Sequence, residues 1–496
     1  MKKFKLLFVI FLLLFSVAPI AVHALTYLDV IKITLENDPN IKIQRNTAAS
    51  YQGLAITAKS TFDPSLTATI SDGYQYSPLS PLKNTNMQLN SSLGYTQKFR
   101  HGLSITPQVS LAHLENYTGK ASANIPNSMQ ASVLFSKPLL QASSEYIITA
   151  KEQIAGLNYL AANETLKYQV NSSIYNSLTQ YWAVLYYKLK INILTEAERD
   201  AKKILLQTKI SVDQDYQPSS DIDQAEANLY DRIVAKIQAE QAFLSALQNL
   251  GIYMGLPIDA AASIKINEDK FPDFGDFPKD FLQRKNVYLE TALKNRSDYQ
   301  SSQIQISSSK IAVDAAKDLY NPNLSLNASL GYSGANYKSN FAVFTGDVVG
   351  ANGTVYLSLD LPIVNNNAEG SYLSAKSIYE KYQNQQSLLK NTIQFTVNQS
   401  MENINKINAQ IKMAKNASSY YKITVENERE KLRLGLSTLQ NVIIMQDKCI
   451  NSQLTYLGVI YNYFSALAKI HYDIQSVVSL QDSGINLNLE DLIRIP

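Results

Sequence analysis

Hydrophobic residues recur at every seventh position along one stretch without proline, from Ser143 to about Tyr216. A second series falls between them, and this alternating three- and four-residue spacing is typical of a coiled-coil seam. The first series is Ile147, Ile154, Ala161, Tyr168, Tyr175, Trp182 and Leu189. At a rise of about 1.5 Å per residue, the stretch predicts a helix of about 100 Å. Compact domains use much shorter helices, so the pattern indicates an elongated molecule.

The same design occurs again from about Ala368 to Arg433. Each long helix is followed by a shorter helical pattern, which predicts one helix pair at about 143–250 and another at about 365–480. The shorter helices are expected to begin after 219–221 and at Thr438, where serine, aspartate and threonine suit a helix cap. A polar tail follows the second pair.

Between the N-terminal helices and the first long helix, the hydrophobic period changes from about 3.6 residues to two. Apolar and polar residues alternate over about 65–137 and again over about 323–361, which predicts strands with one apolar and one polar face. The apolar positions that we expect to face lipid are Leu66, Ala68, Ile70, Leu324, Leu326, Ala328, Leu330, Val355, Leu357 and Leu359.

An offset of 258 residues relates the two halves of the chain: Phe62-Asp63-Pro64 aligns with Tyr320-Asn321-Pro322, for example. We therefore predict a first repeat at 25–256, a linker at 257–280 and a second repeat at 281–496. The first repeat carries about 34 extra residues, enough for an additional hairpin near 100–116. Four prolines between strands and helices are expected to be hinges: Pro64, Pro138, Pro322 and Pro362.

Residues 1–24 are typical of a secretory signal peptide, with Lys2, Lys3 and Lys5 before a short apolar run. A retained anchor is the alternative, but Pro19 interrupts the run. These lysines account for the whole net charge of +3, so the rest of the chain is neutral and no nucleic-acid partner is expected. No later apolar segment reaches about 20 residues, which leaves a closed β-barrel as the route across a bilayer.

No catalytic, cofactor or metal-binding pattern stands out, so neither an enzyme nor a cofactor is predicted. The single cysteine, Cys449, lies in a helical pattern and is expected to be buried filler. His101, His113 and His471 lack the spacing of metal ligands. A few strands with an apolar face cannot close a barrel alone, so several copies must complete it. A soluble β-sandwich is the alternative.

These features together resemble the TolC-like outer-membrane efflux proteins, over essentially the whole chain after the signal. The similar segments are Leu28-Asp29 to Asn37-Asp38-Pro39-Asn40 at the start, the helix-to-strand steps at Pro64 and Pro322, the strand-to-helix steps Ser136–Leu140 and Leu361–Asn365, and the helix tip Leu432–Ser437. The resemblance implies an α+β membrane protein, internally duplicated, in which a homotrimer shares a transmembrane β-barrel of four strands per chain. A long periplasmic α-helical barrel would continue it, with 257–280 in an equatorial belt.

The resemblance also implies a passive exit duct in the outer membrane, which receives its cargo from an inner-membrane transporter through a periplasmic adaptor (membrane fusion protein). Both tripartite efflux and type I secretion use such ducts. The helix tips would form the gate, and the residues expected there are Asp215, Asp221, Asp223, Gly435, Ser437 and Asn441.

This chain departs from the family at the tips, where Asn441 replaces a common aspartate and Asp215 occupies the glycine position of the first tip. Three copies of Asp221 would attract cations, unless Asp221 only caps its helix. The additional hairpin exceeds a four-strand protomer, and either lengthens the outer loops or partly plugs the mouth. The functional alternatives are polypeptide rather than small-molecule export, a periplasmic coiled-coil scaffold without a pore, and, more remotely, a hydrolase.

Overall fold

The computed structural model describes residues 25–77, 84–116, 127–273, 275, 277–336, 348–481, 484–487 and 490–496. The predicted signal peptide lies outside these residues. The chain divides into two compact units, each with segments from both halves of the sequence. We call Ile43–Tyr168 with Leu293–Phe395 the sheet unit, and Met1–Lys42 with Gln169–Ala292 and Thr396–Pro496 the helical unit.

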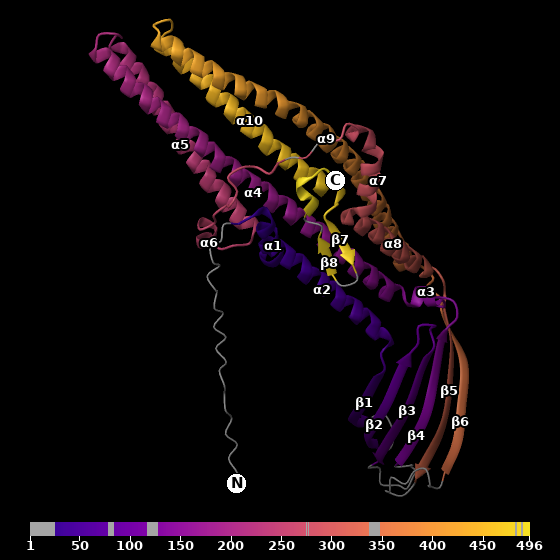
Figure 1. Ribbon diagram of the computed structural model, residues 1–496. Coiled ribbons are helices and arrows are strands. Elements are labelled where there is room, and N and C mark those ends of the chain that lie inside the picture. Colours follow the sequence, from indigo (N-terminus) through magenta and orange to yellow (C-terminus); the bar gives the residue numbers. More distant parts are fainter. Residues whose placement is uncertain are drawn as a thin grey trace, which may run out of the picture. The chain divides into compact units, whose positions relative to one another are not determined.

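The sheet unit contains six antiparallel strands whose order in the sheet is their order in the chain (Figure 1). They are β1 (Ser65–Ser77), β2 (Asn84–Lys98), β3 (Ser104–Asn116), β4 (Asn127–Pro138), β5 (Asn323–Asn336) and β6 (Val348–Asp360). The pairing of β4 with β5 joins the two halves of the chain in one sheet.

The expectation of four strands per chain is wrong for this protein. The additional hairpin is made by β2 and β3, which lie between β1 and β4 and pair with them along their lengths. In the described residues this hairpin therefore neither extends an outer loop nor plugs a mouth. Its own alternation of apolar and polar residues provides the two faces that a strand within a sheet needs.

Four helices lead into or out of the sheet. They are α2 (Pro39–Lys59), followed by the short η1 (Ser60–Phe62), α4 (Ala150–Asp213), α8 (Ser297–Asp318) and α9 (Asn366–Arg433). The first long helix was predicted to begin at Ser143. Instead a single turn, α3 (Glu145–Ile148), is capped by Ser144, and Thr149 separates it from α4. The series of hydrophobic residues at every seventh position has members on both sides of Thr149, at Ile147 and Ile154, and therefore did not reveal the break.

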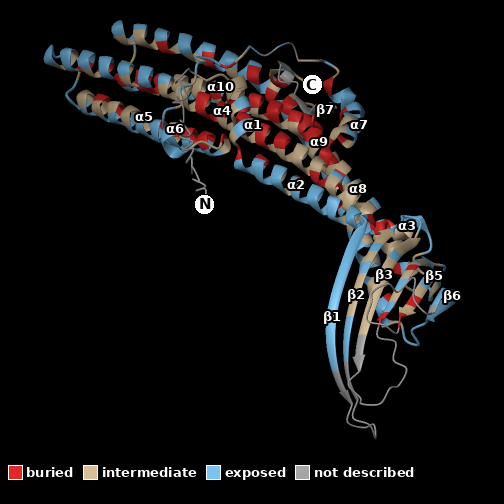
Figure 2. Cartoon of the chain, turned by 90° about the horizontal axis from the view of Figure 1, so that it is seen from below, coloured by how far each residue is buried: buried red, intermediate tan, exposed pale blue. Residues whose placement is uncertain are grey.

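The helical unit contains α1 (Tyr27–Asn37), the remainder of α4 and α9, α5 (Ser220–Tyr253), α6 (Ile258–Ala262), η2 (Phe281–Arg284), α7 (Lys285–Asn295) and α10 (Leu439–Ile474). Its largest buried side chains surround Trp182, which is 1% exposed and contacts the rings of Tyr27, Phe271 and Phe464. Figure 2 shows the buried residues gathered along these helices. Phe271 belongs to the predicted linker, so part of that linker packs against α4 and α10.

Two sequence expectations fail at the end of the chain. The last helix was predicted to reach about residue 480, but α10 ends at Ile474, where Gln475 has a left-handed backbone with φ of 48°. The chain then forms a short antiparallel pair, β7 (Val478–Gln481) and β8 (Gly484–Leu487), and ends in η4 (Glu490–Ile493). A strand pair of four residues each is too short to give a clear periodic signal.

The bounds of three successive elements repeat along the chain. Helices α7 and α8 begin 258 residues after α1 and α2, and β5 begins 258 residues after β1. The capping differs between the copies. Thr26 and Asp29 form a capping box at α1, and Asp38 accepts a hydrogen bond from the Asn40 backbone N–H at 2.8 Å. No described helix has the length and hydrophobicity that a membrane-spanning helix needs.

Candidate functional site

The register of the sheet places apolar residues from all six strands on one face. Leu66 pairs with Tyr95, Val109 with Ala131, and Leu326 with Leu357, and paired residues lie on the same side of a sheet. The predicted positions Leu66, Ala68, Ile70, Leu324, Leu326, Ala328, Leu330, Val355, Leu357 and Leu359 all lie on this face. We call this side of the sheet the apolar face. It is open to its surroundings, since Ile70 is 80% exposed and Val355 is 72% exposed.

The opposite face is polar and almost uncharged. Its central positions are Thr67, Thr69, Asn90, Ser92, Gln108, Ser110, Ser128, Gln130, Asn327, Ser329, Asn352 and Thr354. A hollow of about 610 Å³ lies on this side and is lined by residues from all six strands, including Thr69, Ser110 and Ser333. The sheet is therefore concave toward its polar face.

The two edges of the sheet are β1 and β6, and within the described residues each pairs on one side only. Their unpaired N–H and C=O groups are available to another strand. Because the number of strands is even and all neighbours are antiparallel, β1 and β6 run in opposite directions. A second copy can thus place its β1 beside β6 and continue the same antiparallel pattern.

The turn between β2 and β3 is fixed to the helices of its unit. Arg100 donates hydrogen bonds from Nε and Nη2 to the two carboxylate oxygens of Glu152 on α4, both at 2.9 Å. Its guanidinium also lies 4.9 Å from the ring centre of Phe62. Gly102 has φ of +89°, and a Cβ there would lie 2.8 Å from the Cδ1 of Ile148, so glycine permits both the turn and the close contact.

The four prolines predicted as hinges occupy the transitions between helix and strand. Pro64 follows η1 directly before β1, and Pro322 immediately precedes β5. Pro138 is the last residue of β4, while Pro362 lies between β6 and α9. Their positions fit a fixed φ at a change of secondary structure, and a hinge function stays a prediction.

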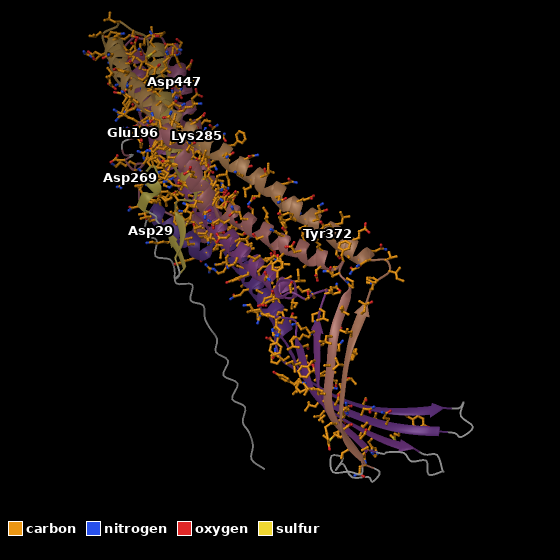
Figure 3. All side chains as sticks on the ribbon, turned by 90° about the vertical axis from the view of Figure 1, so that its right-hand side faces the viewer. Asp29, Glu196, Asp269, Lys285, Tyr372 and Asp447 are labelled. Atoms are coloured by element: carbon orange, nitrogen blue, oxygen red, sulfur yellow. The ribbon has the colours of Figure 1, made fainter. Side chains whose placement is uncertain are left out.

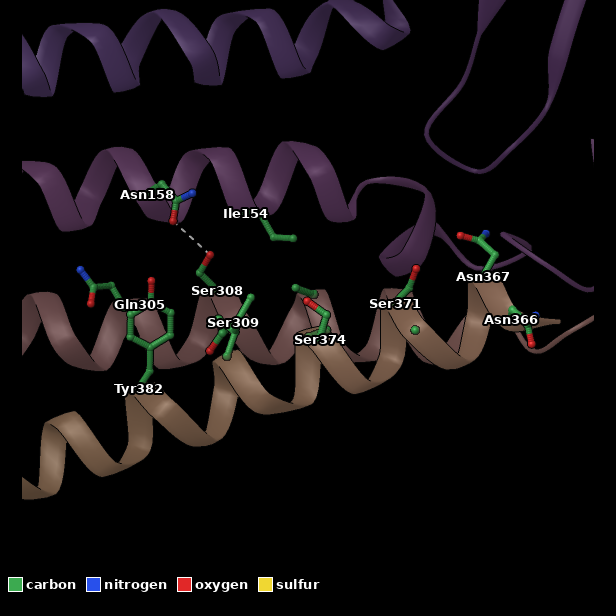
Figure 4. Close-up of a pocket in the computed structure, with 14 residues that line it drawn as sticks. Ile154, Asn158, Gln305, Ser308, Ser309, Asn366, Asn367, Ser371, Ser374 and Tyr382 are labelled. Carbon is green, nitrogen blue, oxygen red and sulfur yellow. Dashed lines mark hydrogen bonds between the residues drawn. The ribbon is translucent and has the colours of Figure 1, made fainter.

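A second hollow of the sheet unit, of about 700 Å³, lies among α4, α8 and α9 (Figure 4). Hydroxyl and amide groups dominate its lining. Ser308 donates a hydrogen bond to Asn158 Oδ1 at 3.1 Å, and Ser371, Ser374 and Tyr382 also line it. The lining contains no pair of carboxylates and no histidine, so this groove offers neither an acid–base pair nor a metal-ligand set.

The two helix tips have the same backbone design. At the first, Asp215 has φ of 58° and Tyr216 N–H donates to Ser211 O at 2.9 Å. At the second, Gly435 has φ of 73° and Leu436 N–H donates to Lys431 O at 2.8 Å. Both helices thus end in a Schellman turn, and Asp215 does occupy the position of the tip glycine.

Side chains complete the second tip but not the first. Ser437 donates to Glu428, Asn441 Nδ2 donates to Ser437 Oγ at 3.4 Å, and Thr438 caps α10. Together with Lys431, Ser437 lowers the pKa of Glu428 by hydrogen bonding to its carboxylate. Asn441 is therefore a structural partner within its tip.

The interpretation of Asp221 as a helix cap is wrong. Ser219 is the residue before α5, its side chain makes no capping hydrogen bond, and Asp221 and Asp223 lie inside the first turn. Their charges suit the positive end of the helix. Asp223 is exposed and Asp221 is partly buried, so both remain candidates for the gate.

Ion pairs connect the two long-helix hairpins of the helical unit. Arg429 on α9 lies 3.0 Å from Asp200 on α4, and Arg232 on α5 pairs with Asp447 on α10. A groove of about 930 Å³ runs between the hairpins and is lined by all four of these helices. Burial lowers the pKa of Arg232. Figure 3 labels Asp447 and, on α4, Glu196, which forms an ion pair with Arg199 in its own helix.

No family model matches the sequence, and no curated protein matches it. Solved structures do. The CmeC outer membrane channel of Campylobacter jejuni is similar with a TM-score of 0.68 and 14% identity, over 90% of this chain and 85% of that one. The outer membrane protein VceC of Vibrio cholerae has the same TM-score and identity, over 90% of this chain and 95% of that one. The open MtrE channel of Neisseria gonorrhoeae is similar with a TM-score of 0.65 and 14% identity, over 90% of this chain and 88% of that one.

The chain has the fold of TolC-like outer-membrane channels. The resemblance inferred from the sequence is thus confirmed at the level of the fold. The identity of 12–14% explains why short motifs in a fixed order, rather than extended similarity, carried that inference.

Sequence reasoning missed the contacts that hold the site together. Arg100 and Glu152 are 52 positions apart, and Arg429 and Asp200 are 229 apart. No periodic pattern links residues at such separations. The additional hairpin predicted near 100–116 indicated a change of direction there, but no partner for Arg100.

Proposed function

We propose that this protein is the outer-membrane exit duct of a tripartite efflux or type I secretion system. The observation that carries the proposal is the six-stranded sheet, which has one exposed apolar face, one almost uncharged polar face and two edges that each pair on one side only in the described residues. Such a sheet is suited to form part of a barrel wall between lipid and water, because backbone groups in lipid must all be paired. A homotrimer completes the barrel by pairing β6 of each copy with β1 of the next.

The helical unit supplies the periplasmic part of this duct. Its two hairpins end in tips with the same turn, and ion pairs between the hairpins restrain them. The protein itself provides no chemistry, so an inner-membrane transporter must supply the energy and a periplasmic adaptor must connect the two. The fold of the outer-membrane channels named above supports this kind of partnership.

Fractionation and planar-bilayer recording test the proposal with a matched pair of variants. Val355 on the apolar face and Thr354 on the polar face are neighbours in β6, and both are exposed. We expect Val355→Arg to prevent membrane insertion, because a charge at the lipid face costs about 2–4 kcal/mol near the bilayer centre. Thr354→Arg should still insert and give channels with altered conductance. A soluble wild-type protein without conductance would instead favour the coiled-coil scaffold.

A further inference from the structure

The hairpin β2–β3 has every property of a wall element. Leu89, Leu93 and Tyr95 on β2 lie on the apolar face, while Asn90 and Ser92 lie on the polar face. On β3, Val109 and Leu111 are apolar-face residues, and Gln108 and Ser110 are polar-face residues. A plug inside a barrel would contact water and polar wall on both sides, and an outer loop would not pair with β1 and β4 over its length.

The hairpin is also held at its inner turn. The Arg100–Glu152 pair and the contact of Gly102 with Ile148 fix the turn against the start of the α3–α4 segment. Gln97 adds a hydrogen bond from Nε2 to the backbone oxygen of Phe62 at 2.9 Å. The turn is thus attached to the helices on both sides of it, before β1 and after β4.

The width of the sheet matches the width of the helices that join it. Strands about 4.8 Å apart and tilted by about 40° each occupy about 6.3 Å of a barrel's circumference, so six cover about 38 Å and four only about 25 Å. Four helices side by side, at 8–10 Å each, cover about 32–40 Å. The sheet unit has four such helices, namely α2, α4, α8 and α9. The estimated widths of six strands and of four helices are therefore similar, whereas four strands are narrower than four helices.

We propose that each copy contributes six strands, so that three copies close an eighteen-stranded barrel. This inference rests on the proposed duct and its three copies. The same geometry gives a barrel about 36 Å across, compared with about 24 Å for twelve strands. The partner of each β6 edge is the β1 edge of a second copy. The membrane section is then the wide part of the passage, and selection of cargo by width falls to the helix tips.

A distance between identical labels measures the width directly. We would replace Cys449 by serine, introduce Ser92→Cys on the polar face of β2, attach a spin label and measure label-to-label distances in the purified oligomer in lipid. Three-fold symmetry predicts about 31 Å between backbone positions for eighteen strands and about 21 Å for twelve. Native mass measurement of the same sample counts the copies. The longer distance in a three-copy oligomer is the expected result.

Other outcomes separate this inference from the proposed function. A distance near 21 Å, or a two-copy oligomer, overturns the eighteen-stranded barrel. If such a sample still shows channel activity, the proposed duct function stands. Loss of all channel activity in the unlabelled wild type would remove the duct itself.

A second pair of variants tests whether the hairpin faces lipid. Leu93→Arg should block insertion, whereas Ser92→Arg, one residue away on the polar face, should insert. Normal insertion of Leu93→Arg would show that β2 does not contact lipid, and would overturn the inference without any need for the label.

Discussion

Arg100 in the turn between β2 and β3 donates two hydrogen bonds to the carboxylate of Glu152 on α4, both of 2.9 Å. Such a bidentate pair is stronger and more directional than a single-contact ion pair. It joins a turn of the sheet directly to a helix. The pair therefore fixes where the hairpin ends.

This contact makes the stability of the turn depend on pH. Hydrogen bonds from Arg100 hold the pKa of Glu152 below its ordinary value. A lowered pKa means that the stabilisation is present above the ordinary carboxylate range, near pH 4.5, and is lost as the pH falls through the folded-state value. We expect Glu152→Gln to lower the melting temperature by about 1–2 °C at pH 7. The difference from wild type should vanish in acid, and a difference that persists there would contradict the assignment.

The two tip turns give opposite predictions for glycine. Asp215 adopts a left-handed backbone that suits glycine better, so Asp215→Gly should stabilise the first tip by about 0.5–1 kcal/mol. Gly435→Ala should destabilise the second tip by about 1 kcal/mol for the same reason. Amide hydrogen exchange at residues 210–220 and 430–440 measures both changes locally. Because one variant introduces the glycine and the other removes it, equivalent turns must respond in opposite directions. A change of the same sign at both tips would show that the two turns are not equivalent.

Much of the fold could be predicted because it depends on local periodicity. The strand alternation at Leu66–Ile70 and Leu324–Leu330 set the correct faces, since side chains along a strand alternate whatever the strand pairs with. The same alternation predicted the additional hairpin of the first repeat, but not how many strands one sheet would hold. The family resemblance implied four, whereas the pairing of β2 and β3 with β1 and β4 depends on residues distant in sequence.

The candidate gate was only partly predictable, for a similar reason. Gly435 and Asp215 were identified because a helix end has a local signature. Whether Asp221 caps its helix was left open, because a serine and an aspartate before a helix both suit capping and only the backbone shows which residue lies outside the helix. The pairs Arg429–Asp200 and Arg232–Asp447 bring together four helices and left no local signal.

The reactivity of Cys449 tests the absence of thiol chemistry. Its side chain is partly buried, and this burial raises the pKa of the thiol. A raised pKa leaves less thiolate at pH 7.5, and the thiolate is the reactive form. We expect alkylation of the native protein to be several-fold slower than alkylation of the same protein in denaturant, and to accelerate as the pH rises toward 9. Rapid alkylation at pH 7 would indicate an activated thiol.

The ion pair between Arg429 and Asp200 should restrain the tips. Each side chain is about one-third exposed, so the pair contributes little to global stability, on the order of 0.2–1 kcal/mol. It nevertheless joins α9 to α4, and a duct made of three copies of the chain would contain three such links. We expect Asp200→Asn to leave the melting temperature nearly unchanged, while it increases the fraction of time that channels spend in their larger conductance state.

Glu196 provides the matched control for this prediction. It lies one turn before Asp200 on the same helix, and it forms an ion pair with Arg199 within α4. Glu196→Gln removes the same charge without breaking a link between the hairpins, so it should leave gating as in wild type. If both variants open the channel equally, the effect comes from the net charge of the groove. If only Asp200→Asn increases opening, the link between α4 and α9 restrains the tips, because both variants remove one negative charge from α4 but only Asp200→Asn breaks an ion pair between the hairpins.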